Sequence, residues 1–207
     1  MKDPQIRTFQ KHPFRLKINK KRSNIFLVSV STLCLIFASL TIGVTNAAMR
    51  IVLQRVKSAS VAVDNSKISS IGPGCLALVG LHENDTEENL HECCKKLLAA
   101  KLWENDNGGQ WRHGVKQKNY EVLCVSQFTL YGTLSKKNQP DYKLAMKSVP
   151  AQELYNKFLA LLKENYEEDK IFDGRFGAMM DVELINDGPV TLVIDSEPLG
   201  ECKNTEK

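Results

Sequence analysis

Polar side chains that could take part in chemistry gather at the end of one strongly apolar run of the chain. Residues 120–125 read Tyr-Glu-Val-Leu-Cys-Val, a composition typical of a β-strand. Ser126, Gln127, Phe128 and Thr129 follow directly. The end of a buried strand is where α/β folds often hold a ligand. This segment is therefore the first candidate for a functional site.

A second candidate is the segment 186–191, which reads Asn-Asp-Gly-Pro-Val-Thr. Its flanks, 180–185 and 190–194, have the composition of strands, which predicts a β-hairpin with Asp187 and Gly188 in its bend. The Gly188–Pro189 bond could be cis, and two successive carbonyls would then point the same way out of the turn. From these six residues alone a plain surface turn with a trans proline is favoured, because only about 5–6% of X-Pro bonds in folded proteins are cis.

The sequence lacks the usual arrangements of hydrolytic residues. None of the four histidines adjoins a plausible nucleophile, and there is no GxSxG or HExxH motif. The hydroxyl groups of Ser126 and Thr191 have no visible base, so a covalent acyl-enzyme is weakly supported. The six cysteines form no CxxC or Cys/His set with metal-ligand spacing, and we expect neither a metal nor a cofactor.

Charge is divided unevenly along the chain. The whole chain has a net charge of +4, but residues 1–24 hold eight Lys or Arg and one acid, and residues 25–48 hold no charge. The remainder is therefore mildly acidic, which argues against a broad electrostatic grip on nucleic acid. Contact with RNA phosphates would need a local cluster. Lys136, Lys137 and Lys143, in and beside the polar loop 134–141, are one such candidate, although a plain solvated loop is the favoured interpretation of these lysines.

The N-terminal segment has two interpretations of equal weight. Residues 1–24 are basic and are expected to form no packed structure, and residues 25–48 have the length and apolarity of a signal anchor or membrane span. The small residues Asn46, Ala47 and Ala48 also suit a cleavable targeting segment. Alternatively, the working protein starts at Met49. We expect a cytoplasmic protein, with an organelle-targeted or membrane-anchored form as the alternative.

The remaining sequence predicts one α/β domain over residues 49–197, followed by a short polar tail, 198–207. Strands are expected from Met49, over 67–71, over 75–81, over 120–125, and on both sides of the predicted hairpin. One helix is expected to start near Thr86, with Leu90, Cys94, Leu97, Leu98 and Leu102 along its apolar face, and a second to start at Pro150.

Four motifs together resemble the D-aminoacyl-tRNA deacylase (D-tyrosyl-tRNA deacylase) family. They are Met-Arg-Ile-Val-Leu-Gln-Arg-Val at 49–56, Ser-Gln-Phe-Thr-Leu at 126–130, Gly-Arg-Phe-Gly-Ala-Met-Met at 174–180 and the segment 186–191. The resemblance runs from Met49 to about Glu197. It implies a compact mixed-sheet domain that acts as a two-fold homodimer with sites at the subunit interface.

The resemblance also implies a function and roles for individual residues. Such enzymes hydrolyse the ester at the 3′ end of D-aminoacyl-tRNA, and of glycyl-tRNA mischarged on tRNA(Ala), without a cofactor. Ser126, Gln127 and Thr129 would orient the substrate, and the backbone near Phe128 would face the developing oxyanion. Gly188 and Pro189 would form a Gly-cis-Pro element that selects against L-amino acids from within the partner's pocket. The remaining candidates are Arg55 as the brace of that element, Met180 as a wall of the adenosine pocket, Asn186 as a supporting residue, and Thr191, whose role stays open.

Two alternatives accompany this reading of the chain. A nucleic-acid-binding protein on the same fold, without turnover, is the second hypothesis, and the acidic domain argues against it. A membrane-tethered enzyme is the third, and it applies only if residues 25–48 are a real anchor.

Overall fold

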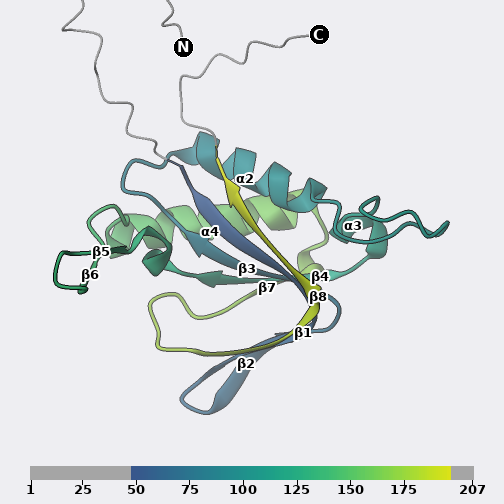
Figure 1. Cartoon of the computed structure of the whole chain (residues 1–207), viewed down its shortest axis with the longest axis horizontal. Helices are drawn as coiled ribbons and strands as arrows, with labels where there is room; N and C mark the ends of the chain where they lie inside the picture. Colours follow the sequence, from purple (N-terminus) through teal and green to yellow (C-terminus); the bar gives the residue numbers. More distant parts are fainter. Residues whose placement is uncertain (1–47, 197–207) are drawn as a thin grey trace, which may run out of the picture. The chain divides into compact units, whose positions relative to one another are not determined.

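A computed structural model describes residues 48–196 (Figure 1). The expectations for residues 1–24, for all of 25–48 except Ala48, and for the tail 198–207 lie outside the described residues. Among the described residues, no helix is both long and apolar enough to cross a membrane.

The long strand β1 (Arg50–Val63) organises a mixed sheet. Its first half pairs antiparallel with β3 (Gly74–Gly80), and its second half pairs antiparallel with β2 (Ser66–Ile71). β3 continues in parallel to β4 (Glu121–Ser126), and β4 in parallel to β7 (Ile171–Asp173). The strands predicted over 67–71, 75–81 and 120–125 are confirmed as β2, β3 and β4.

The predicted hairpin around Gly188 is wrong. Residues 181–195 form one strand, β8 (Asp181–Asp195), which runs antiparallel beside both halves of β1. Arg55 faces Val190 and the next residue, Val56, faces Asn186, so residues 187–189 bulge out of the ladder. A bulge explains why a proline, which cannot donate to a ladder, is tolerated here.

Two long helices cover one face of the sheet (Figure 1). α2 (Glu87–Ala99) begins after its N-cap Thr86, and α4 (Ser148–Asn165) contains Pro150 in its first turn. The predicted apolar face of α2 is buried, and Leu102 is buried just beyond the helix end. A four-residue helix, α3 (Val115–Lys118), and two short 3-10 helices, η1 (Phe128–Tyr131) and η2 (Glu168–Lys170), complete the helical elements of residues 48–196.

Side chains from both faces of the sheet are buried, in two clusters. On β3, Cys75, Ala77 and Val79 pack with the helices, whereas Leu76 belongs to the second cluster with Val61 of β1. β4 divides its side chains in the same alternating way. This double burial fixes the register of β4, so the residues that follow it emerge at a defined place at the edge of the helical layer.

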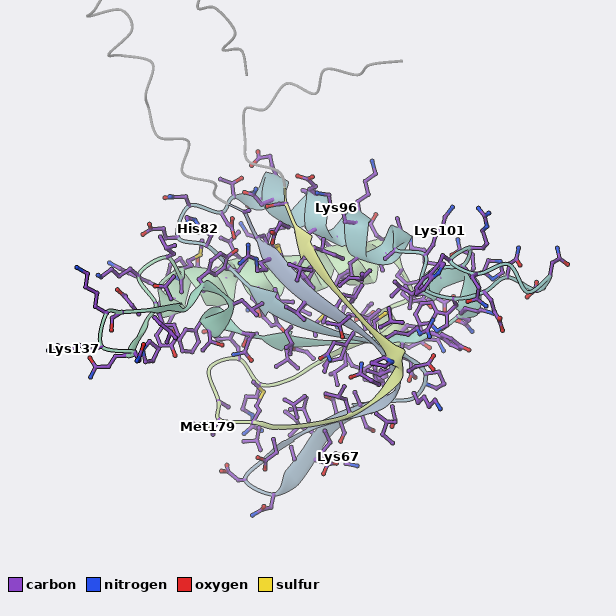
Figure 2. The ribbon with its side chains drawn as sticks, viewed as in Figure 1. Lys67, His82, Lys96, Lys101, Lys137 and Met179 are labelled. Atoms are coloured by element: carbon purple, nitrogen blue, oxygen red, sulfur yellow. The ribbon has the colours of Figure 1, made fainter. Side chains whose placement is uncertain are left out.

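The polar loop predicted over 134–141 contains a small two-stranded ladder of β5 (Thr133–Leu134) and β6 (Pro140–Asp141). Lys137 projects from the connection between these strands (Figure 2). Lys143 is bound to Asp141 at 2.8 Å, and its side chain remains largely exposed. Lys136 and Lys137 are therefore exposed on this loop and available to an anionic partner, whereas Lys143 beside it is paired with Asp141.

Candidate active site

A cavity of about 370 Å³ opens where β4 ends. Ser126, Gln127 and Phe128 line it, together with residues of β3, of α4 and of the turn before β8. The register of β4 brings the three residues to the cavity, because the backbone N–H of Gln127 extends the ladder by donating to the carbonyl of Val79 (2.7 Å). The remaining lining residues are largely apolar: Val79, Leu81, Met146, Ser148, Ala151, Tyr155, Phe176 and Gly177. Such a lining suits an aromatic or aliphatic group held by a few polar atoms.

Phe128 stands at the mouth of this cavity. It begins η1, its side chain is 57% exposed, and its ring packs edge-on against Tyr142 with 5.0 Å between centroids. Backbone N–H groups at the start of such a helix have no partner within the helix. The fourth predicted residue of the segment, Thr129, lies outside the cavity and accepts a hydrogen bond from the side-chain amide of Gln127 (2.5 Å). Thr129 therefore fixes Gln127 rather than lining the cavity itself.

The wall of the cavity contains a buried tyrosine, bound to a half-buried aspartate, that sequence reasoning missed. Tyr155 of α4 is fully buried, and its hydroxyl donates to Asp173 Oδ1 at 2.5 Å. Burial raises the pKa of Asp173 above its usual value, although the hydrogen bond from Tyr155 acts the other way. Burial also raises the pKa of Tyr155 well above 10. The pair therefore holds a neutral phenol against the cavity, and it ties α4 to β7.

The segment around Gly188 lies on the surface of β8. Gly188 and Pro189 are exposed, the bond between them is cis, and Gly188 has φ +117°. A Cβ added to Gly188 would lie 2.9 Å from Val190 Cγ2 and 3.1 Å from Arg55 Nη2. Glycine is therefore required here by both backbone conformation and space.

Arg55 connects this bulge to two other parts of the chain. Its Nε atom lies 3.0 Å from Asp187 Oδ2 and donates to the Asp187 carbonyl at 3.2 Å. Its Nη1 donates to the carbonyl of Leu102, and its guanidinium lies 5.8 Å from the ring centroid of Trp111. Asn186, at the other end of the bulge from Val190, is also bound to Arg55, because its side-chain amide donates to the Arg55 carbonyl (3.2 Å). The predicted partners Arg55 and Asn186 thus meet at the bulge, and the exposed Trp111 joins them without having been predicted.

Thr191 and Met180 lie away from the cavity. Thr191 is an exposed residue of β8 opposite Gln54, two positions after Pro189. Met180 packs with the second core cluster, and its sulfur accepts the N–H of Arg175 at 3.3 Å in the turn before β8. The structure therefore does not bring either of them to Ser126 within one chain.

The cavity and the bulge are separated within one chain. Ser126 of β4 pairs with Val79 of β3, and Val79 pairs with Ile51 of β1. On the other side of β1, Ile51 pairs with Ile194 of β8. The bulge of β8 lies four residues farther along β1, beside Arg55. Four residues along β1 correspond to about 13 Å, and three strand spacings add about 14 Å across the sheet. In Figure 1 the loop of β5 and β6 that follows η1 lies on the left, and α3, which follows the Trp111 loop, lies on the right.

Comparison with known proteins places this arrangement in a family. The family model for D-Tyr-tRNA(Tyr) deacylase matches residues 52–195. The chain belongs to the D-Tyr-tRNA(Tyr) deacylase family. The matched range contains the cavity segment, the bulge, Arg55 and Trp111, so all parts of the candidate site lie within the family domain.

The relatives in this deacylase family match the chain over 76% to 99% of their own length. A D-aminoacyl-tRNA deacylase of Drosophila melanogaster is 49% identical over 159 residues, which cover 77% of this chain and 98% of the relative. That of Saccharomyces cerevisiae is 44% identical and is covered over 99% of its length, against 72% of this chain. D-aminoacyl-tRNA deacylase 1 of Homo sapiens is 43% identical, with 77% of this chain and 76% of the relative covered.

Two solved structures are similar to this member of the deacylase family. One, described as a c-Myc DNA unwinding element binding protein, is 43% identical with a TM-score of 0.68, and the match covers 70% of this chain and 97% of the other. The second, described as a probable eukaryotic D-amino acid tRNA deacylase, has a TM-score of 0.62 over 72% of this chain and 99% of its own. At 16% identity the second supports the fold alone.

Proposed function

We propose that this protein hydrolyses the ester of D-aminoacyl-tRNA, releasing free tRNA and the D-amino acid. The observation that carries the proposal is the cavity at the end of β4, which presents Ser126, Gln127 and Phe128 of the family's motif in an otherwise apolar lining. Membership of the deacylase family supports the same reaction.

The proposed chemistry needs little acid–base help from the protein. Water attacks the ester carbonyl and loses a proton, the bond to the ribose oxygen breaks, and the released ribose oxygen takes up that proton to become a hydroxyl. As the family resemblance implies, the neighbouring ribose hydroxyl assists this attack. Ser126 and Gln127 orient the substrate end, Thr129 holds the Gln127 amide in place, and the backbone N–H groups at Phe128 stabilise the oxyanion. A mechanism in which the protein supplies only positioning and oxyanion stabilisation agrees with the lack of a nucleophile–base pair in the sequence.

The site is proposed to be complete only in a two-fold homodimer. Each protomer inserts its Gly188–Pro189 bulge into the cavity of the other, where main-chain carbonyls accept the amino group of the substrate and leave no room for an L side chain. The separation of bulge and cavity within one chain supports this arrangement. Exposed apolar side chains on β8, namely Ile185, Leu192 and Val193, offer a surface for the second copy.

The remaining candidate residues receive roles on this proposal. Arg55 and Asn186 hold the bulge in position through the contacts described above. Met180 walls the adenosine pocket, and Thr191 lies close enough to Pro189 to contact the partner subunit. Achiral glycine fits the same pocket, so glycyl-tRNA mischarged on tRNA(Ala) is a second expected substrate. Lys136, Lys137 and Lys143 are the proposed contacts to the tRNA backbone.

Chiral deacylation with matched substrates tests the proposed function. The full chain is incubated with D-Tyr-tRNA and with L-Tyr-tRNA, and the surviving ester is measured over time. The expected result is rapid loss of the D ester alone. Equal survival of both esters with freshly prepared protein contradicts the proposal.

A second candidate function is nucleic-acid binding without turnover. It is favoured by one observation, the description of a 43% identical solved structure as a DNA unwinding element binding protein. Binding that weakens steeply with salt while both esters survive would support this alternative. Turnover of the D ester would exclude it as the sole function.

A further inference from the structure

A buried carboxylate outside the candidate active site has an unused oxygen. Asp85, just before α2, is 7% exposed. Its Oδ2 accepts the backbone N–H of His82 at 2.7 Å, and its own N–H donates to the His82 carbonyl at 3.0 Å. Its Oδ1 is buried and has no hydrogen-bond partner among residues 48–196. A buried acceptor without a partner is costly, so the chain is expected to supply a donor in its working form.

The register of the sheet places Asp85 beside the start of β1. Arg50 faces Gly80 in the β1–β3 ladder, so the same register would place Ala48 opposite His82. Both backbone groups of His82 that would face this position are instead bound by Asp85. Asp85 therefore ends the ladder and lies where β1 enters the sheet.

Tyr131 lies at the same place. Its hydroxyl donates to the carbonyl of Ala48, and its ring stands edge-on to His82 with 5.3 Å between centroids. The carbonyl of Met49 is also enclosed, because it accepts the N–H of Ser196 at 2.9 Å and the thiol of Cys93 at 3.5 Å. Figure 2 shows His82 at the same edge of the molecule as Lys96 on α2. The entry of β1 is thus surrounded by groups that can bind polar atoms of the backbone.

The cations on the surrounding elements are bound elsewhere. Arg50 forms two contacts with the Asp195 carboxylate, at 2.8 and 3.1 Å, and Lys96 donates to the Asp195 carbonyl at 2.8 Å. The other titratable groups around Asp85 are the hydroxyl of Tyr131, the thiol of Cys93 and the imidazole of His82, whose Nδ1 accepts the N–H of Asn84 at 3.2 Å. The guanidinium of Arg50 lies 5.8 Å from the ring centroid of Tyr131, but no described group donates a hydrogen bond to Asp85 Oδ1.

We propose that Asp85 and Tyr131 form a binding site for the α-ammonium group of a chain that begins at Met49. A primary ammonium offers three donors and a positive charge. Asp85 Oδ1 accepts one donor, and the Tyr131 oxygen, freed from Ala48, accepts another. Cleavage after Ala48 and initiation at Met49 both produce this group, so the site identifies the mature N-terminus by either route. The relatives from Drosophila and yeast consist almost wholly of this domain, so we expect the shortened chain to fold on its own.

The pocket predicts a different pH response for the two forms of the chain. In the chain that continues before Met49, burial raises the pKa of Asp85 to about 7, whereas the hydrogen bond from His82 lowers it. The folded protein then keeps a proton that the unfolded chain releases, so stability falls as pH rises from about 4 to about 7. An ammonium group beside Asp85 restores its ionised form and removes this loss.

The test compares three proteins: residues 49–207 with a free N-terminus, the same chain with Ser-Gly added before Met49, and the full chain. The pKa of the Met49 α-amino group is measured from the pH dependence of its acylation, and the Tm of each protein is measured from pH 5 to pH 8. In the free form the pKa is expected to rise by about one unit above the ordinary value of about 8. The Tm of both extended forms is expected to fall across this pH range by about 4 °C more than that of the free form.

Two substitutions keep the proposal open to contradiction. Asp85→Asn keeps an acceptor for His82, and it is expected to return the α-amino pKa to its ordinary value and to abolish the difference in Tm between forms. Glu83→Gln, two residues away, is the control and is expected to change neither. The proposal would be overturned if the α-amino pKa of the free form had its ordinary value and did not change in Asp85→Asn. Identical Tm profiles for the free and Ser-Gly forms would overturn it as well.

Discussion

Arg55 and Asp187 are joined twice, because the same Nε atom lies 3.0 Å from the Asp187 carboxylate and 3.2 Å from its carbonyl oxygen. The side chains are 15% and 33% exposed, so solvent screens this pair less than it screens a surface ion pair. The contact fixes the residue immediately before Gly188, and Trp111 covers the guanidinium. The orientation of the bulge therefore depends on a side chain from another strand.

Arg55→Lys is the first prediction. An ammonium cannot reproduce the planar fork that contacts Asp187, Leu102 and Trp111 together, so the bulge should lose its fixed orientation. We expect kcat/KM for D-Tyr-tRNA to fall about tenfold or more, and the free energy of unfolding to fall by about 1–2 kcal/mol. Single-turnover deacylation and urea unfolding measure the two effects.

The matched control for Arg55 lies on the same strand. Arg50 also binds an aspartate of β8, with 2.8 Å to Asp195, but it lies beside Ile51 rather than beside the bulge. Its side chain is 39% exposed, so Arg50→Lys should change stability by less than about 1 kcal/mol and leave deacylation intact. Equal activity losses in both variants would indicate that Arg55 acts only through general stability.

Gly188→Ala is the second prediction. The new Cβ would meet Val190 and Arg55 at 2.9 and 3.1 Å in a residue with φ +117°, so the bulge must shift. Gly108→Ala is the control, because Gly108 has φ +76° but nothing within 4 Å of the added atom. Both substitutions should destabilise the fold by about 1–2 kcal/mol through backbone strain. Only Gly188→Ala is expected to abolish deacylation, and a fully active Gly188→Ala protein would contradict the role of the bulge.

Phe128→Ala is the third prediction. The side chain is 57% exposed at the mouth of the cavity, so its removal should change the free energy of unfolding by less than about 0.5 kcal/mol. The cavity wall would nevertheless be lost, and kcat/KM for D-Tyr-tRNA should fall about tenfold. Val149→Ala, at a 71% exposed apolar residue of α4, is the control and should affect neither quantity. Unchanged kinetics in Phe128→Ala would place the reaction elsewhere.

Asp173→Asn is the fourth prediction and concerns pH. Because the folded-state pKa of Asp173 lies above its ordinary value of 3.8, folding retains a proton that the unfolded chain releases. Stability therefore falls as pH rises from about 4 through the folded-state pKa, by about 1.4 kcal/mol for each unit of elevation. Asparagine still accepts the hydrogen bond from Tyr155 but does not titrate. The free energy of unfolding of the variant should therefore rise relative to that of the original protein as pH increases from 4 to 7. A constant difference across this range would contradict the assignment.

The central strands and helices could be predicted from sequence because their signals are local and long. β3 and β4 are continuous apolar runs, and α2 combines a capping residue with a four-residue apolar period. That residues 187–189 form a bulge in one strand, and not the bend of a hairpin, could not be predicted in the same way. Turn residues between two strand-like runs look alike whether the runs pair with each other or both pair with β1, and only the tertiary register distinguishes the two cases.

The candidate site was predictable only in part, for the same reason. The segments 126–129 and 186–191 are visible because they are contiguous in sequence. Tyr155 and Asp173 lie 18 residues apart on different elements, and Trp111 belongs to a loop that the sequence analysis did not identify as functional. Their contacts arise from packing between elements, which no local pattern records.

The most direct measurement for the composite site is complementation between the inactive Gly188→Ala variant and the weakly active Phe128→Ala variant. Gly188→Ala protomers keep a normal cavity, and Phe128→Ala protomers keep a normal bulge. After the two proteins are unfolded together and refolded, half of the dimers should be mixed, and each mixed dimer should hold one intact site. The account predicts recovery of about a quarter of the original D-Tyr-tRNA deacylase activity. Activity no greater than the sum of the two variants refolded separately would contradict a site shared between subunits.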